Sequence, residues 1–412
     1  MSKQSKTSKQ PVFAGEAVAE VQGLYGPFTF PERLLQKIWQ RSDYDGSGLR
    51  TAAGQGLTVV YPGRWNHLGG PDFDGARLII GGREVVGDVE LHLHAKDWAA
   101  HGHADDPAYD NVLLHVVLFP CAETHTKGAS GREIPILCLL PRLHHGLEEY
   151  AADEAMEHLA GRPLHQALEI LGALDREALN ETLSTHASRR WRSKVHFAGE
   201  RIKRLGWEGA CHHAAMEILG YRFNRAPMLT VATTWPLGDW AAGRVDPAMI
   251  FEELAGRWAL QGVRPLNHPL LRLRQYSEWC KSCPDWPVRL REDSGLHALA
   301  SATIDASVGE WRRTVRLTSI RGGLKTRICG GVIGGSRLDN LIADGFMPLL
   351  AAEAGLDLES AWSGWFVGDA PAVVVEVLRQ LDVFDGRGRP VAMGPVQGLL
   401  GWMLEREACA RG

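Results

Sequence analysis

Three short runs of β-branched and aliphatic residues lie close together in the first quarter of the chain, with glycine after or between them. They read LTVVYPG from Leu57, ARLIIGG from Ala76, and REVVGDVELHLH over residues 83–94. Such runs are typical of strands joined by tight turns, and Gly81-Gly82 suits a two-residue hairpin. The sequence therefore predicts a meander of strands in this region.

The flanking segments have other periodicities. A helix is predicted over residues 31–41, because Pro31 suits a first helical position and apolar residues follow at helical spacing. Residues 111–119 are apolar on both faces, which is typical of a central strand. Residues 134–140, IPILCLL, predict another strand. From about residue 146 onward the apolar spacing becomes mainly helical.

This change of periodicity indicates a domain boundary near residue 145. The 412 residues exceed the size at which a single core usually stops growing. We predict a disordered polar tail over residues 1–10, a mixed-sheet domain over residues 11–145 and a mainly α-helical domain over residues 146–412. The predicted fold class is α/β (α+β), with the sheet first and the helices after it.

Composition and charge limit the expected cellular compartment and binding partners of the protein. A net charge of -4 gives no global attraction to nucleic acid or to anionic membranes, so such binding would need a local patch. No run approaches the roughly 18 apolar residues of a membrane helix, and no apolar segment follows the first lysines, as a signal peptide would require. Seven scattered cysteines suit free thiols. We expect a cytoplasmic protein without a membrane partner, and composition leaves its oligomeric state open.

The run GDVELHLH places ionisable groups on one face of a strand. Successive strand side chains point to opposite faces, so Asp88, Glu90, His92 and His94 share a face. A half-buried strand with one wet face produces the same alternation without any function. The pattern by itself therefore leaves both interpretations open.

Neighbouring residues favour a site. Asp72 precedes Glu90 by 18 residues, across a hairpin that would bring the two carboxylates together. His115 lies inside an apolar strand, where an unpaired imidazole would cost free energy. His101 and His103 add two more imidazoles on a loop. We therefore predict a metal site in this part of the chain.

The order of predicted elements, with Asp at the start of one strand and Glu-x-His on the next, resembles the PD-(D/E)XK nuclease superfamily. Pro71-Asp72 matches the first half of its motif, Glu90-Leu91-His92 the second, and Glu32 on the leading helix matches an accessory acid. The resemblance implies a nuclease-like fold, one or two divalent ions between Asp72 and Glu90, and hydrolysis of phosphodiester bonds in DNA or RNA.

The third position of the motif departs from the superfamily, which has lysine there. His92 is a candidate general base or ligand, but a neutral imidazole has no fixed positive charge. Lys96 shares the parity of His92 and would supply a cation if the strand extends that far. Imidazole ligands, with His94 and His115 as candidates, shift the expected metal from Mg²⁺ toward Mn²⁺ or Zn²⁺.

A longer pattern, GPDF..A...I.G....GDVELH....DW..HGH..D..Y.NV.LHVV, resembles a bacterial family known as domain of unknown function 2851. The resemblance extends more loosely through RPLNHPLLRLRQ (264–275) and IGGSRLDNLI (333–342). It implies membership of that family and no particular activity.

Two alternatives to an active nuclease stay open. The loss of the lysine favours a nucleic-acid-binding or scaffold protein that keeps the fold without catalysis. The sequence Gly87, then His92-Leu-His94, then Asp97 also resembles the cupin motif, in which histidines and an acid bind a metal inside a β-barrel. In that case the ligands would be drawn from the histidines, His92, His94, His101, His103 and His115.

Basic residues cluster in the helical half. Arg189, Arg190, Arg192 and Lys194 surround Trp191, and such a row would track a phosphate backbone while the indole stacks on a base. A solvated helix gives the same composition. We take the four cations as candidate substrate-binding residues.

Two further motifs stand apart from this row. A second basic group, Arg264, Arg272 and Arg274, surrounds Asn267. The glycine-rich run over residues 330–337 lacks the Lys-Ser/Thr ending of a P-loop, so a turn or close helix packing is favoured over an anion cradle.

Overall fold

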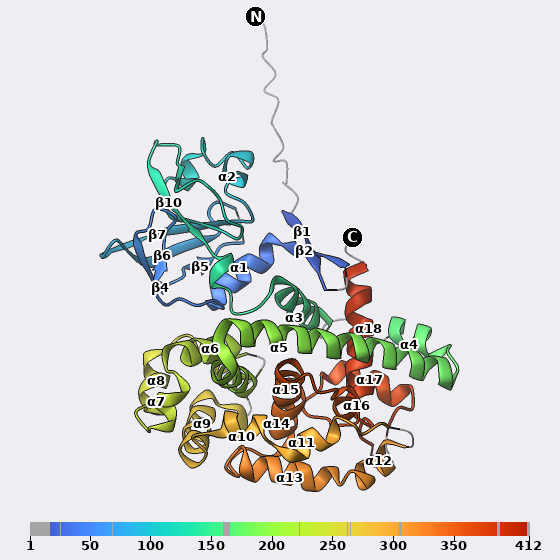
Figure 1. Ribbon diagram of the computed structural model, residues 1–412. Coiled ribbons are helices and arrows are strands. Elements are labelled where there is room, and N and C mark those ends of the chain that lie inside the picture. Colours follow the sequence, from blue (N-terminus) through green and yellow to red (C-terminus); the bar gives the residue numbers. More distant parts are fainter. Residues whose placement is uncertain are drawn as a thin grey trace, which may run out of the picture. The chain divides into compact units, whose positions relative to one another are not determined.

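The computed structural model divides the chain into two compact units (Figure 1). The first comprises residues up to 21, 29–40 and 48–143, and the second comprises residues 22–28, 41–47 and 144 onward. The predicted tail over residues 1–10 and Arg264 lie outside the described residues. The structure describes residues 17–24, 26–67, 69–159, 165–221, 223–261, 263, 265–304, 307–384 and 388–409.

The predicted leading helix is confirmed as α1 (Glu32–Arg41). Leu34, Leu35 and Ile38 lie on its buried face, as their spacing requires. The acidic Glu32 in the first turn and the basic Arg41 in the last complement the helix dipole. A two-stranded sheet, β1 (Val18–Gly23) with β2 (Gly26–Pro31), precedes the helix.

The predicted meander forms the centre of the first unit. Strands β4 (Gly56–Tyr61), β6 (Phe73–Ile80) and β7 (Arg83–His92) pair in antiparallel order. Gly81 and Gly82 both have positive φ, 58° and 81°, as a tight hairpin with two left-handed residues needs. Two short strands lie outside this core of the meander, β3 (Leu49–Arg50) on β4 and β5 (Arg64–Trp65) on β6.

The sheet then changes direction. Strand β8 (Val112–Val117) pairs parallel to β7, with Glu90 opposite His115, after a crossover that holds α2 (Asp97–Ala100) and the 3₁₀ turn η1 (Pro107–Tyr109). Strand β10 (Glu133–Cys138) pairs parallel to β8, and β9 (His125–Lys127) lies antiparallel at the edge. The sheet is therefore mixed, and its strand order is β3-β4-β6-β7-β8-β10-β9.

The second unit is helical, which confirms a helical C-terminal region. A long helix, α5, carries the N-cap Asp175, whose carboxylate accepts from the Ala178 N–H at 2.8 Å. A break in the helix falls at Gly206, with φ of 69°, because glycine adopts this conformation without steric cost. The helices are α3 (Leu147–Leu159), α4 (His165–Gly172), α5 (Arg176–Gly220), α6 (Arg225–Thr234), α7 (Leu237–Ala241), α8 (Pro247–Glu253), α9 (Pro269–Ser282), α10 (Trp286–Arg291), α11 (Ser294–Leu299), α12 (Val308–Thr314), α13 (Leu317–Arg327), α14 (Gly335–Asn340), α15 (Met347–Ala354), α16 (Glu359–Ser363), α17 (Ala372–Gln380) and α18 (Met393–Cys409). Short turns of this unit are η3 (Pro265–Asn267) and the π-helical η4 (Leu341–Phe346), whereas η2 (Leu140–Arg142) belongs to the first unit.

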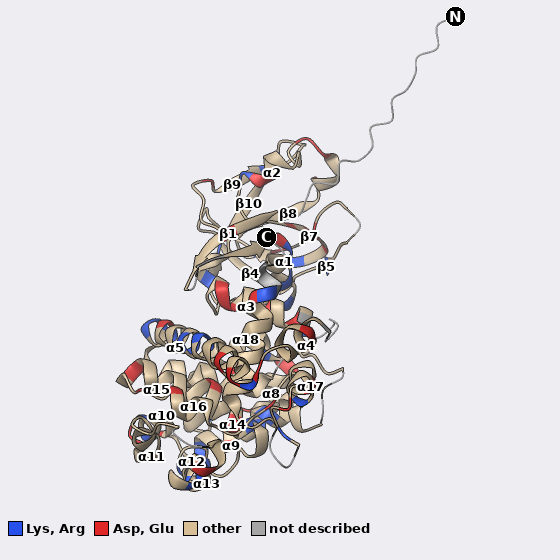
Figure 2. Cartoon of the chain, turned by 90° about the vertical axis from the view of Figure 1, so that its right-hand side faces the viewer, with Lys and Arg blue, Asp and Glu red and all other residues tan. Residues whose placement is uncertain are grey.

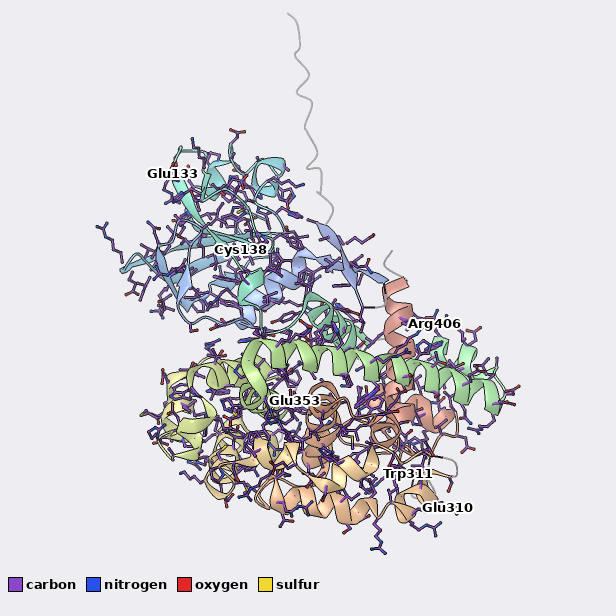
Figure 3. All side chains as sticks on the ribbon, viewed as in Figure 1. Glu133, Cys138, Glu310, Trp311, Glu353 and Arg406 are labelled. Atoms are coloured by element: carbon purple, nitrogen blue, oxygen red, sulfur yellow. The ribbon has the colours of Figure 1, made fainter. Side chains whose placement is uncertain are left out.

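Aromatic residues dominate the core of this unit, while its surface carries both signs of charge. Figure 2 shows Lys and Arg residues interspersed with Asp and Glu residues over the helices, and Trp311, labelled in Figure 3, is 4% exposed. Burying such large rings supplies much of the apolar area that stabilises a helical core. No helix within the described ranges combines the length and apolar character needed to cross a bilayer. The tryptophans of the core are Trp191, Trp207, Trp240, Trp258, Trp279, Trp286, Trp311, Trp362 and Trp365.

A substitution at Gly87, where β7 closely approaches β8, tests the pairing of these two strands. A Cβ at Gly87 would lie 2.6 Å from the Leu113 Cγ and 2.7 Å from the Asn111 carbonyl oxygen. Gly87→Ala should therefore destabilise the protein by about 1–3 kcal/mol through overpacking, measured as a lower urea midpoint. Gly56→Ala is the matched control, because a Cβ there meets nothing within 4 Å and should change stability by less than about 0.5 kcal/mol. Equal midpoints for the two variants would contradict the parallel pairing described here.

Candidate metal centre

Two carboxylates are held together across the β6–β7 hairpin. The Glu90 Oε2 accepts from the Asp72 backbone N–H at 2.9 Å, and the Asp72 Oδ2 accepts from the Leu91 N–H at 3.0 Å. The Asp72 Oδ1 accepts from the Gln36 Nε2 on α1 at 2.7 Å. Each acid is thus fixed by the backbone that carries the other, which is the proximity the hairpin predicts.

Helix α1 brings a third acid to the pair. The Glu32 Oε2 is buried and has no hydrogen-bond partner. Burial, followed by the charges of Asp72, Glu90 and Asp97, raises the pKa of Glu32 to about 8. Burial likewise raises the pKa of Glu90 to about 8. For Asp72, burial and then the Glu90 charge raise the pKa well above its usual value.

Crowded acids with raised pKa values are a chemically informative combination. A nearby cation would stabilise the ionised forms of Glu32, Asp72 and Glu90, whereas without one they compete for protons. The orphaned Glu32 oxygen supplies a donor that the protein itself does not use. The carboxylates therefore fit a divalent cation.

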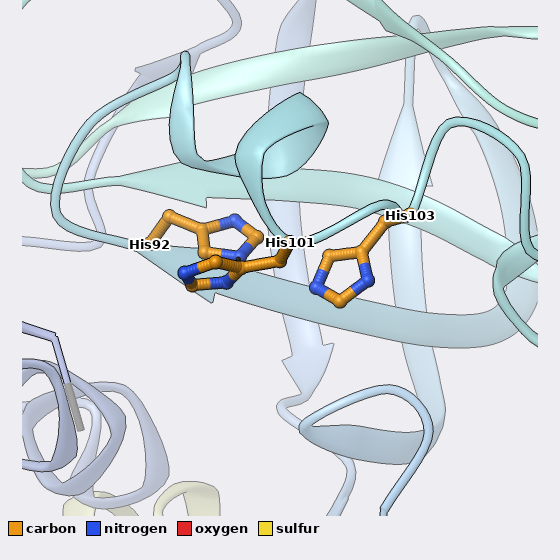
Figure 4. Close-up of side chains that lie close together, drawn as sticks. All are labelled: His92, His101 and His103. Atoms are coloured by element: carbon orange, nitrogen blue, oxygen red, sulfur yellow. Dashed lines mark hydrogen bonds between the residues drawn. The ribbon is translucent and has the colours of Figure 1, made fainter. Parts of the chain in front are cut away.

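The imidazoles of His92, His101 and His103 lie close together (Figure 4). The His92 Nε2 lies 3.0 Å from the His101 Nδ1, and the His103 Nε2 lies 3.2 Å from the Glu90 Oε1. One nitrogen from each of His92, His101 and His103 falls within 4.8 Å of the others. His92 is fully buried whereas His101 is exposed, so solvent reaches one side of the group.

The imidazoles are held neutral. Burial, with neighbouring imidazoles second, lowers the pKa of His92 to about 2 and that of His115 to about 3. Burial lowers the pKa of His103 to about 4. A neutral imidazole is the form that binds metals, so this group fits Mn²⁺ or Zn²⁺.

His115 supports His92 rather than joining the three. Its Nε2 lies 2.9 Å from the His92 Nδ1, and its Nδ1 lies 2.8 Å from the Thr126 Oγ1. Both of its ring nitrogens are therefore occupied within the protein. Such a hydrogen bond orients the ring of a metal-binding histidine and selects its tautomer.

Aromatic rings pack against the group formed by His92, His101 and His103. The Trp98 indole is fixed by a hydrogen bond from its Nε1 to the Lys127 carbonyl at 3.0 Å and meets His92 edge-on. Tyr109 stacks on His103 with ring centroids 3.8 Å apart. These contacts hold His103 inward although it lies on a loop.

Two predicted residues lie outside the centre. Strand β7 ends at His92, so the prediction that His94 continues the same face is wrong. The exposed His94 ring stacks on Phe119 at 4.9 Å. Lys96 is exposed at the N-cap of α2, past the end of the strand, and does not replace the missing lysine. His92 therefore lies in the histidine group and His94 lies outside it, which separates the pair on which the cupin-like alternative depends.

The basic row on α5 is engaged with the protein. The Arg189 Nη1 donates to the Glu405 carboxylate at 2.7 Å, and the Lys194 Nζ donates to the Asp344 carboxylate at 2.9 Å. Figure 2 shows acidic residues among the basic ones on these helices. Two of the four cations of the row, Arg189 and Lys194, are therefore in ion pairs within the helical unit.

The other two cations of the row donate to neutral groups, and the indole between them is buried. The Arg190 Nε donates to Gln397 at 2.7 Å, and the Arg192 Nε donates to the Ser188 carbonyl at 3.4 Å. Trp191 is 5% exposed and packs on Trp362, so the prediction that its indole stacks on a base is wrong.

Sequence reasoning missed four residues of the centre, which are Gln36, Trp98, Tyr109 and Thr126. A signal existed for Gln36, because it follows Glu32 by four residues and therefore shares its face of α1. Trp98 and Tyr109 had no local signal, since their role depends on how the crossover folds back on β7.

Comparison with known proteins bears on the family alone. A family model described as "Protein of unknown function (DUF2851)" matches residues 32–254, more than half of the chain. This range includes Glu32, Asp72, Glu90 and the clustered imidazoles. No curated protein and no solved structure matches the chain.

Metal binding tests the histidine group. His103→Gln should weaken binding of Zn²⁺ or Mn²⁺ to tag-free, chelator-treated protein by at least about tenfold, since even residues that only orient metal ligands cost 10–100-fold. His94→Gln is the matched control and should bind as the wild type does. Isothermal titration calorimetry measures both. An unchanged affinity in His103→Gln would remove this residue from the metal centre.

The crowded acids predict a pH dependence of stability. The folded-state pKa of Glu32, about 8, lies above its usual value of 4.5, so folding favours its protonated form. Its stabilising contribution is complete below pH 4.5 and is lost as the pH rises through about 8. Glu32→Gln removes this loss, so in metal-free protein it should raise the unfolding temperature at about pH 8.5 and not at about pH 5.

The control for this experiment is Glu84→Gln, which changes an exposed carboxylate on β7. It should shift the unfolding temperature little at either pH. The account of the acids would be contradicted if Glu32→Gln had the same effect at both pH values.

Proposed function

Because the chain belongs to the family of proteins of unknown function DUF2851, which carries no activity to transfer, we propose its function from the site itself. The proposal is a metal-dependent hydrolase that cleaves phosphodiester bonds in nucleic acid. Asp72 and Glu90 hold the metal, Glu32 assists them, and the imidazoles of His92, His101 and His103 complete the centre.

One observation carries this proposal, which is the position of Glu90 between two donor sets. Its Oε2 is locked to the Asp72 backbone, while its Oε1 faces His103 at 3.2 Å and His92 at 3.6 Å. A carboxylate in this position can serve an ion among the acids or an ion among the imidazoles. Both arrangements fit hydrolytic metal centres.

The order of elements supports phosphodiester chemistry in particular. The nuclease-like resemblance predicts a helix, a strand, a second strand with Asp at its start, a hairpin, a third strand with Glu-x-His, a helix or loop and a fourth strand. In this chain α1 is followed by β4, β6 and β7, then by α2, then by β8 parallel to β7. Asp72 stands immediately before β6 and Glu90 near the end of β7, and these positions support the proposal.

The residues of the chain divide the chemical work. A divalent ion bound here would lower the pKa of a water molecule that it carries. Asp72 and Glu90, fixed by backbone hydrogen bonds, orient the centre. Burial, with the neighbouring His103 second, lowers the pKa of His101, and with the ion held by the carboxylates its exposed, neutral imidazole would be available to accept a proton from the attacking water.

A second candidate is a nucleic-acid-binding or scaffold protein without catalysis. One observation favours it: both ring nitrogens of His92, the residue at the lysine position, already face other imidazoles. His92 is then a member of a hydrogen-bonded chain and not a free base. In either case DNA or RNA is the proposed partner, and a cytoplasmic location stays a prediction.

Hydrolysis assays separate the candidates. Wild-type protein should cleave single- or double-stranded DNA or RNA with Mg²⁺, Mn²⁺ or Zn²⁺ and lose that activity with a chelator. Asp72→Asn and Glu90→Gln should abolish cleavage, because each neutralises a carboxylate of the centre, whereas His94→Gln should retain it. Cleavage that survives both substitutions would rule out this site. Binding of nucleic acid without cleavage by any metal-loaded form would select the second candidate.

A further inference from the structure

Two buried arginines meet in the helical unit, far along the chain from the metal centre. Arg272 on α9 is 7% exposed and Arg337 on α14 is 5% exposed. Both guanidinium groups donate to a single acceptor, the Asn267 Oδ1, from the Arg272 Nη2 at 2.7 Å and the Arg337 Nη2 at 3.4 Å. Two positive charges are thus held against one neutral carbonyl oxygen.

The charges of this pair are not balanced. Arg337 has a carboxylate partner, the Asp369 Oδ2 at 2.9 Å. Arg272 has no carboxylate within 4.0 Å in the described part of the chain, and its acceptors are the neutral amides of Asn267 and Gln275. A buried charge without a counter-charge is strongly unfavourable. Asp369 acts on both guanidiniums, so the two buried cations share this carboxylate and Arg272 lacks a contact ion pair among the described residues.

Each of the two guanidiniums also has an unused donor. The Nε atoms of both Arg272 and Arg337 are buried and have no hydrogen-bond partner. Burial and the neighbouring Arg337 lower the pKa of Arg272 to about 10, so the group is still charged at neutral pH. Buried donors are normally satisfied, and two on adjacent guanidiniums are an exception that needs an explanation.

We propose that Arg272 and Arg337 form a binding site for a small oxyanion of the phosphate type. A guanidinium presents parallel N–H donors that match the oxygens of phosphate, and such charge-assisted pairs are stronger than neutral hydrogen bonds. The anion supplies the missing negative charge and accepts from the unused Nε donors. The site lies wholly in the second unit, so it does not depend on the proposed hydrolase activity.

The surroundings hold Arg337 in place for this role. Its Nη1 donates to the Ile218 carbonyl at 3.0 Å, at the end of α5, and its guanidinium lies over the Tyr221 ring at 4.7 Å. A side chain fixed in this way loses little freedom when an anion binds. These contacts explain Arg337 as a structural residue as well, but among the described residues Arg272 has no contact ion pair.

The site unites motifs that are distant in sequence. Asn267 and Arg272 come from RPLNHPLLRLRQ, and Arg337 comes from the end of the glycine-rich run. Asn267 and Gln275 are half-buried and Asp369 is exposed, so the guanidiniums lie just beneath the surface. A free inorganic phosphate and the phosphate of a nucleotide share the required chemistry.

Calorimetric titration of the full-length protein tests the proposal and separates the two sources. The ligands are inorganic phosphate, a nucleoside 5′-monophosphate and the corresponding nucleoside, in a buffer of low ionic strength without sulfate or phosphate. We expect the wild type to bind at least one phosphate-bearing ligand and not the nucleoside. Arg272→Gln should weaken that binding by at least about tenfold, whereas Arg274→Gln, exposed on the same helix, should leave it unchanged.

A second variant keeps the test decisive if Arg272→Gln fails to fold. Asn267→Asp is nearly isosteric and places a carboxylate against both guanidiniums. It should raise the unfolding temperature in phosphate-free buffer and abolish the further rise that phosphate produces in the wild type. The proposal is overturned if no phosphate-bearing ligand binds the wild type, if Arg272→Gln and Arg274→Gln bind equally, or if Asn267→Asp keeps the phosphate response.

Discussion

Asp72 and Glu90 hold each other in place through the backbone, and the candidate centre depends on this mutual constraint. Each carboxylate accepts an N–H from the strand segment that carries the other acid. The geometry keeps two acidic groups together in a largely buried place, and Glu32 arrives from α1 as a third. Burial raises the pKa values of all three acids, and repulsion adds to it for Glu32 and Asp72, so at high pH the fold keeps an arrangement that costs stability. Such local cost is typical of functional sites.

The parallel pairing of β7 and β8 adds the imidazoles to this constraint. Glu90 lies opposite His115 in the register, and the crossover between the two strands returns His101 and His103 to the same edge. The candidate centre therefore has carboxylate oxygen donors on one side of Glu90 and neutral imidazole nitrogen donors on the other. Under the proposed function, a histidine where the nuclease-like motif has lysine would be compatible with metal chemistry, because the ion would supply the positive charge.

Much of the first unit could be predicted because its signals are local. Gly81-Gly82 and the flanking β-branched runs determine the hairpin, and the hairpin determines that Asp72 and Glu90 approach each other. The end of β7 at His92 could not be predicted, because residues 93 and 94 continue the same alternation and only the turn into α2 stops it. The alternation therefore predicts His94 on the strand, whereas this residue lies beyond the end of β7.

The helical unit was less predictable because its contacts are distant in sequence. The partners of Arg189 and Lys194 are Glu405 and Asp344, which no local pattern relates to the basic row. Residues 22–28 and 41–47 also belong to this unit. This could not be predicted either, because periodicity indicates the type of an element and not its packing partner.

The central claim, that a metal ion binds at Glu90 between the acids and the imidazoles, is tested most directly by anomalous diffraction from crystals soaked in Zn²⁺ or Mn²⁺. The account predicts an anomalous peak about 2.0–2.2 Å from a Glu90 carboxylate oxygen and from the nitrogen of at least one of His92, His101 and His103. A fully soaked crystal with no peak at Glu90, or with its strongest peak at exposed His94, would contradict it.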